Sequence, residues 1–168
     1  MLIRSFAAFL RNSPDADAAL IIAGDGQQLI ELKQLVKTLN IDDKVVLTGF
    51  LDNPYPLYKT CDIFVSTSSS EGISNALLEA MYLGSVPVST PSGGIEEIIL
   101  DGENGFLVPF ADEKKLAAVI GKLYHNPQHR KAVGSAAHIT VTQLFSIPRM
   151  DKELLEFLTE MTLNRQRS

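Results

Sequence analysis

The chain has 168 residues, of which 45% are hydrophobic and 21% are charged. This size and apolar content predict one globular domain over residues 1–168 and exclude an intrinsically disordered chain. The formal charge of −5 gives no basic surface, so we expect no nucleic-acid partner. Cys61 is the single cysteine, which excludes a disulfide-stapled fold and favours a reducing compartment such as the cytoplasm.

No run approaches the roughly 20 apolar residues that span a bilayer, and the first residues lack the features of a signal peptide. Leu2, Phe6, Phe9 and Leu10 instead recur at helical spacing. We therefore expect the chain to open in a helix, with no strand before it.

Short apolar runs then alternate with helical patterns. In chain order we predict a strand at 19–23, a helix at 29–39, a strand at 45–47, a short segment around 58–59, a strand at 61–65, a helix at 74–83, a strand at 86–89, a helix at 95–100, a strand at 106–108 and helices at 116–124, 128–137 and 149–161. Unbroken apolar strands separated by helices are typical of a parallel sheet covered on both sides. The predicted fold is a doubly wound, Rossmann-like α/β sheet.

Glycine and small polar residues follow several of the predicted strands, at 24–26, 48–49, 66–72 and 90–94. In doubly wound sheets, ligands bind outside the carboxyl ends of the strands. A row of such loops suits a polar ligand that carries phosphate, although each loop by itself is typical of an ordinary turn.

Other kinds of site fit poorly. Gly24 and Gly26 match the first two glycines of the dinucleotide fingerprint, but Leu29 takes the third position, and the sequence has no P-loop. Neither Ser74 nor Ser92 lies in a nucleophile elbow. A nicotinamide site and a serine nucleophile are therefore disfavoured.

The histidines give no metal site either. Asn126 and Pro127 separate His125 from His129, so the two rings do not share one helix face. We predict that these two residues and His138 are surface histidines. Since no other cluster of ligands is evident, we expect no metal.

Two carboxylates lie around one predicted helix start. Glu71 precedes the helix and Glu79 lies about a turn and a half into it. Ser74 or Asn75 can cap the helix, and the free N–H groups near Gly72 favour an anion. Glu79 can accept hydrogen bonds from two ribose hydroxyls. A nucleoside diphosphate sugar fits all these features, whereas the spacing alone favours two ordinary surface carboxylates.

This stretch resembles the family 4 glycosyltransferases, which are retaining enzymes of the GT-B fold. The resemblance runs from the opening helix onward and is sharpest between Ser68 and Pro109. Its motifs are Ser68-x-x-Glu71-Gly72, Leu78-Glu79-Ala80-Met81 with Gly84 and Pro87, Gly93-Gly94-x-x-Glu97, and Gly102-x-x-Gly105-x-Leu107-Val108.

The resemblance implies a role for each matching residue. Glu71 is the catalytic-site residue against the donor sugar, and Glu79 holds the ribose hydroxyls. The loop residues Gly72, Ile73 and Ser74 face the sugar and diphosphate, and the segment Phe50, Leu51, Asp52 borders the base. Ile73 stands where an aromatic residue is common, and Asn75 where many members have proline. Apart from the nucleoside diphosphate sugar donor, no cofactor and no metal are implied.

Family members also carry a strand and a loop with Arg and Lys before the opening helix, and an acceptor-binding domain before that. The 168 residues contain neither, so the resemblance implies the carboxyl-terminal, donor-binding half alone. The sheet is then expected to lack its usual first central strand, between the strands at 19–23 and 61–65. We expect a cytoplasmic location, at the inner face of the membrane if the absent half binds there peripherally.

Two other interpretations stay open. The chain can be a non-catalytic nucleotide-binding or partner-binding module that works with a separate subunit. A flavodoxin-like receiver is disfavoured, because it does not explain the pair Glu71 and Glu79 or the glycines at 93 and 94.

Overall fold

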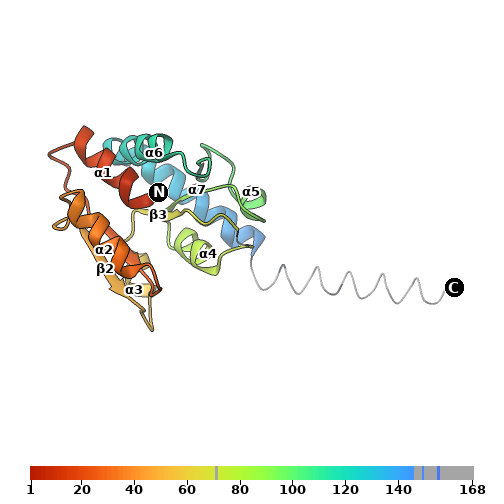
Figure 1. Cartoon of the computed structure of the whole chain (residues 1–168). Coiled ribbons are helices and arrows are strands. Elements are labelled where there is room, and N and C mark those ends of the chain that lie inside the picture. Colours follow the sequence, from red (N-terminus) through yellow and green to blue (C-terminus); the bar gives the residue numbers. More distant parts are fainter. Residues whose placement is uncertain (71, 146–148, 150–154, 156–168) are drawn as a thin grey trace.

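The structure is a computed structural model that describes residues 1–70, 72–145, 149 and 155. Its elements, in chain order, are α1 (Leu2–Asn12), β1 (Leu20–Ala23), α2 (Leu29–Thr38), β2 (Val45–Gly49), α3 (Tyr55–Thr60), β3 (Ile63–Ser66), α4 (Asn75–Tyr82), β4 (Val86–Ser89), α5 (Ile95–Ile98), β5 (Phe106–Leu107), α6 (Glu113–His125) and α7 (Pro127–Leu144) (Figure 1). The predicted order of strands and helices is confirmed. The helix predicted at 149–161 lies outside the described residues, except for Arg149 and Leu155.

Several element boundaries differ from the prediction. The short segment around 58–59 is a helix, α3, because Pro56 lies in its first turn, where proline is tolerated. Cys61 ends this helix, so β3 begins at Ile63 instead of at residue 61. α7 continues past the predicted end at 137 to Leu144.

The strands form two separate parallel sheets. β1 pairs with β2, while β4 pairs with both β3 and β5. Within the described residues no strand pairing joins the two sheets. β1 and β3 each have one edge without a partner strand among the described residues, so the gap between the first and third strands stays a prediction.

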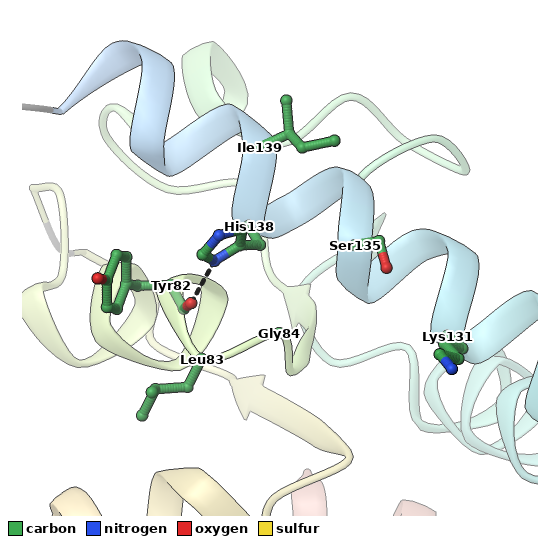
Figure 2. A pocket seen from close by; sticks show the side chains of 7 residues that line it. All are labelled: Tyr82, Leu83, Gly84, Lys131, Ser135, His138 and Ile139. Carbon is green, nitrogen blue, oxygen red and sulfur yellow. Dashed lines mark hydrogen bonds between the residues drawn. The ribbon is translucent and has the colours of Figure 1, made fainter.

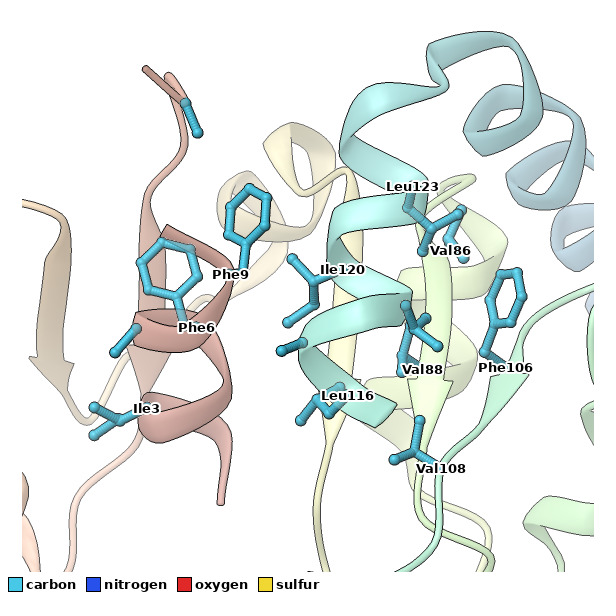
Figure 3. Close-up of a cluster of buried hydrophobic side chains, with 14 of the residues drawn as sticks. Ile3, Phe6, Phe9, Val86, Val88, Phe106, Val108, Leu116, Ile120 and Leu123 are labelled. Atoms are coloured by element: carbon cyan, nitrogen blue, oxygen red, sulfur yellow. The ribbon is translucent and has the colours of Figure 1, made fainter. Parts of the chain in front are cut away.

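A single hydrophobic cluster nevertheless joins the two sheets. α1 packs along α6, and Figure 3 shows side chains of both helices together with those of β4 and β5. The cluster takes in alternate strand residues, namely Leu20 and Ile22 of β1, Val45 and Leu47 of β2, Ile63 and Val65 of β3, Val86 and Val88 of β4, and Phe106 of β5. Both sheets therefore turn one face toward the same hydrophobic cluster, to which α1, α2 and α6 also contribute.

A second cluster covers the other face of the three-stranded sheet. It consists of residues from α4, the α5 region and α7, which are Leu77, Met81, Ile95, Ile98, Ile99, Ala137 and Val141. α7 approaches the end of α4 so closely that a Cβ atom at Gly134 would overlap the carbonyl oxygen of Gly84. Since every residue of β4 is buried, the prediction of helices on both faces is confirmed for this sheet.

The two-stranded sheet is covered on one face only. Ile21 and Val46 are paired neighbours on its other face, and they are 42% and 52% exposed. The helix that packs on β1 and β2, α2, lies on the side of Val45 and Leu47, and this leaves Ile21 and Val46 facing outward. None of the described helices is both long and apolar enough to cross a membrane.

Candidate functional site

The loops that follow the strands are joined in two pairs. The backbone N–H of Gly24 donates to the carbonyl oxygen of Gly49 at 2.8 Å, which ties the loop after β1 to the end of β2. The hydroxyl of Thr90 donates to the carbonyl oxygen of Ser68 at 2.6 Å, which ties the loop after β4 to the loop after β3. The carboxyl ends of neighbouring strands are thus held together within each sheet.

The second of these pairs leads into the start of α4. Ser74 occupies the N-cap position, as predicted, with an extended backbone (φ −73°, ψ 120°). Its side chain makes no capping hydrogen bond, contrary to the expectation that it satisfies a first-turn N–H. The first-turn backbone N–H groups of α4 therefore have no side-chain cap and are available to an anion.

Gly72 and Ile73 precede this helix start. Gly72 is exposed, and Ile73 is 42% exposed although its side chain rests against the next loop. A Cβ atom at Gly94 would lie 2.9 Å from Cγ1 of Ile73, so the two residues are in close contact. Glu71, the predicted catalytic-site residue, lies outside the described residues.

Glu79 lies on α4 with its side chain exposed. α3 packs against α4 on this side, and burial followed by the negative charge of Glu79 raises the pKa of the Tyr58 phenol of α3. The Tyr58 ring also packs edge-on against Phe64 of β3, with 6.1 Å between ring centroids. The sequence analysis missed Tyr58, since one tyrosine in a turn-rich stretch gives no periodic signal.

The segment predicted to border a base follows β2 directly. Phe50 is 73% exposed, Leu51 is partly buried and Asp52 is exposed. Because Phe50 is so exposed at the end of β2, its ring offers a flat apolar surface to a ligand at this loop. None of the predicted site residues is Lys or Arg.

The histidines and Cys61 form no site in the described part of the chain. No group of three His, Cys, Asp or Glu side chains there is placed to hold a metal ion. His125 and His138 are exposed, as predicted, and His125 shares a hydrogen bond of 2.8 Å with Ser13. His129 is not the surface histidine that was predicted. Its ring packs against Phe106, and its Nε2 atom is buried and has no hydrogen-bond partner.

A groove of about 610 Å³ lies at the opposite end of α4 (Figure 2). The imidazole of His138 donates from Nδ1 to the carbonyl oxygen of Tyr82 there, and the two rings stand 5.3 Å apart. Lys131 and Ser135 of α7 complete the polar part of its wall. The groove contains none of the predicted site residues, so it is distinct from the helix start at Ser74.

Comparison with known proteins gives a family. The family described as "Glycosyl transferases group 1" matches residues 1–139. The N-acetyl-alpha-D-glucosaminyl L-malate synthase of Bacillus anthracis is 33% identical over 138 residues, which are 82% of this chain and 36% of that protein. The N-acetylgalactosamine-N,N'-diacetylbacillosaminyl-diphospho-undecaprenol 4-alpha-N-acetylgalactosaminyltransferase of Campylobacter jejuni is 31% identical over 159 residues, or 94% of this chain and 42% of that protein. The chain thus spans less than half the length of these relatives.

Solved structures agree with the fold. Anabaena HepE in complex with UDP superposes with a TM-score of 0.83 and 26% identity, over 95% of this chain and 45% of that one. The C-terminal domain of a glycosyl transferase group 1 protein, LpcC from Francisella tularensis, gives a TM-score of 0.78 and 27% identity, over 87% of this chain and 78% of that one. The doubly wound α/β fold predicted from the sequence is therefore confirmed.

Proposed function

This chain belongs to the group 1 glycosyl transferases, and we propose that it is the donor-binding half of a retaining, family 4 enzyme. The observation that carries the proposal is the start of α4. There an uncapped helix N-terminus, which favours a diphosphate, lies about a turn and a half from the exposed carboxylate of Glu79. The similarity to HepE, whose structure contains UDP, supports a nucleotide as the ligand.

The proposed contacts follow the chemistry of the donor. Glu79 accepts hydrogen bonds from the two ribose hydroxyls, and Phe50, Leu51 and Asp52 border the base. The backbone groups of Gly72, Ile73 and Ser74 face the diphosphate and the sugar, and Glu71 lies against the sugar.

The proposed reaction replaces one glycosidic bond by another on the same face of the sugar. The bond between the anomeric carbon and the diphosphate oxygen breaks, and the leaving diphosphate takes the electron pair. The acceptor hydroxyl forms the new bond, and its proton goes to the diphosphate, so no metal and no other cofactor are needed. Arg or Lys side chains add to the stabilisation of the leaving group that a helix N-terminus gives, and the site residues proposed here include neither.

The acceptor is proposed to be a hydroxyl of a glycan or of a lipid-linked sugar. The name of the Campylobacter jejuni relative includes an undecaprenol diphosphate, which supports a lipid-linked acceptor. Such chemistry belongs to polysaccharide biosynthesis in the cytoplasm, at the inner face of the membrane. The single cysteine agrees with a reducing compartment.

We propose that an acceptor domain and one sheet strand come from polypeptide outside residues 1–168. Two observations support this. The chain covers 36% and 42% of two relatives, and β1 and β3 each have an edge without a partner strand, as the predicted gap between the sheets requires. A non-catalytic module that works with a separate subunit remains the second candidate, because the same gap can take a strand of that subunit.

The ribose contact can be tested with Glu79→Ala. A hydrogen bond to a charged group is worth about 1.5–3 kcal/mol, so we expect UDP affinity to fall at least about tenfold. Isothermal titration calorimetry of the 168-residue chain with UDP measures it. Glu31→Ala, which removes an exposed helical carboxylate from α2, is the matched control and should leave the affinity unchanged.

Either of two results contradicts the proposal. Unchanged UDP affinity in Glu79→Ala removes the ribose role of this residue. No UDP binding by the unaltered chain, with heat-unfolding data showing that it is folded, removes nucleotide binding by residues 1–168.

A further inference from the structure

The loop between β3 and α4 is fixed to the loop after β4 at two points. We call residues 67–70 and 72–74 the donor loop, because the proposed function places them next to the diphosphate and sugar. The first fixed point is Thr90, which is 2% exposed. Its backbone N–H donates to Ser66 at 3.1 Å, and its hydroxyl donates to Ser68 at 2.6 Å.

The hydroxyl of Thr90 therefore extends the pairing of β3 and β4 into the donor loop. Its backbone bond is the last rung of the parallel ladder, and its side chain supplies a further bond two residues beyond the end of β3. The hydroxyl of Ser89 donates to the carbonyl oxygen of Thr90 at 3.1 Å and holds the next peptide in place. Buried polar groups of this kind cost stability when a partner is removed.

The second fixed point is Gly94. Its backbone (φ −79°, ψ 6°) is one that any residue adopts, so conformation does not require glycine there. Space is tight instead: a Cβ atom would lie 2.9 Å from Cγ1 and 3.4 Å from Cδ1 of Ile73, so the Ile73 side chain must shift if Gly94 is replaced. The Ile73 side chain therefore rests on the bare backbone of Gly94.

We propose that Thr90 and Gly94 are positioning residues for donor binding. Thr90 sets the first part of the donor loop through Ser68, and Gly94 sets its last part through Ile73, immediately before the N-cap Ser74. The first-turn N–H groups of α4 then meet the diphosphate in a place fixed before binding, which lowers the entropic cost of binding. This inference rests on the proposed function, and its test separates the two.

The first test removes the hydroxyl of Thr90 and keeps its shape. Thr90→Val should weaken UDP binding about fivefold to tenfold, within the range of one hydrogen bond. Thr90→Ser restores the hydroxyl and should bind UDP within about twofold of the unaltered chain. Thr142→Val is the matched control, because the Thr142 hydroxyl also donates to a carbonyl oxygen, that of His138, but far along α7.

The second test changes the space at Gly94. Gly94→Ala should weaken UDP binding by pushing Ile73 and the donor loop away. The double variant Gly94→Ala, Ile73→Ala removes the overlapping Cγ1 atom and should recover part of the lost affinity. Urea unfolding of both variants is the control, and a loss of UDP affinity that only follows a loss of stability overturns the role of Gly94.

Amide hydrogen exchange without nucleotide separates this inference from the proposed function. Thr90→Val should speed exchange in residues 67–70 while α6 and α7 stay as protected as before. Faster exchange there in a chain that does not bind UDP contradicts the proposed function and leaves the positioning of the loop standing. Unchanged exchange and unchanged UDP affinity overturn the positioning role. A lower unfolding midpoint with unchanged affinity also overturns it, since that is a purely structural effect.

Discussion

The two sheets of this chain have similar strands but different surroundings. β4 lies between β3 and β5 and is buried at every residue, with α4 and α7 on one face and α6 on the other. β1 and β2 have only each other as partners, and alternate residues on one face are exposed. Apolar strand sequences alone therefore do not say how many layers cover a strand.

The edges of the strands also differ in their hydrogen bonding. Leu20 and Gly24 donate toward β2, so the N–H groups of Ile21 and Ala23, which alternate with them, point away from β2 to the unpaired edge of β1. β1 and β3, which would border the predicted gap, both contribute to the hydrophobic cluster of α1 and α6. A strand placed there would find free backbone partners at β1 and β3 and an apolar layer on one face, as expected for an added strand.

The largest expected difference is in amide hydrogen exchange. The N–H of Val88 points toward β3 from the middle of a buried strand, and it exchanges only when the fold opens extensively. The N–H of Ile21 points to an unpaired edge and needs no such opening. With unfolding free energies of about 5–15 kcal/mol, we expect Val88 to exchange at least about a thousandfold more slowly.

Exchange of intact protein followed by NMR gives both rates in one sample. Leu20, whose N–H is bonded to the carbonyl oxygen of Lys44 at 2.8 Å, is the control within β1 and should be slower than Ile21. Equal protection of Ile21 and Val88 would mean that the β1 edge is already paired in solution.

A matched pair of substitutions measures the difference in coverage. Val88→Ala removes two buried methyl groups and should lower the free energy of unfolding by about 2 kcal/mol. Val46→Ala removes the same groups from a side chain that is 52% exposed and should cost under about 0.5 kcal/mol. Urea unfolding followed by circular dichroism gives both values. If Val46→Ala costs as much as Val88→Ala, the open face of the two-stranded sheet is covered in solution.

Much of the fold follows from the sequence because its signals are local. The apolar runs around Ile21, Val46 and Val88 predict strands, and Asn126 with Pro127 predicts the break between α6 and α7. The gap between the first and third strands is a prediction of the family resemblance and not of any residue. A local pattern cannot reveal the absence of a strand.

The parts of the site that sequence reasoning missed depend on contacts between distant segments. Thr90 follows β4 and donates to Ser68, which follows the neighbouring strand β3. The lack of a side chain at Gly94 is significant only because Ile73 packs against it. Tyr58 lies beside Glu79 through the packing of α3 on α4. In each case the residue type is ordinary for its place in the chain, so only the fold shows its partner.

The smallest expected effect concerns the thiol next to the three-stranded sheet. Burial raises the pKa of Cys61, although hydrogen bonds with Ser85 and Ile63 oppose this shift. The folded state therefore favours the neutral thiol, and this contribution to stability is complete below the ordinary thiol pKa of about 8.5. It is lost as the pH rises through the higher pKa of the folded state, because the unfolded chain ionises first.

The variant Cys61→Ala isolates this contribution. We expect the unfolding free energy of the unaltered chain to fall more steeply than that of Cys61→Ala above pH 8.5, and the difference between them to be constant below pH 7.5. Urea unfolding at several pH values measures both curves. Tyr58, whose pKa is also raised, gives a loss of the same sign at higher pH, and Cys61→Ala removes only the last and smallest cause of that shift, after burial and Glu79. If the unfolding free energies of the two proteins keep a constant difference across the whole pH range, the thiol is not buried in solution.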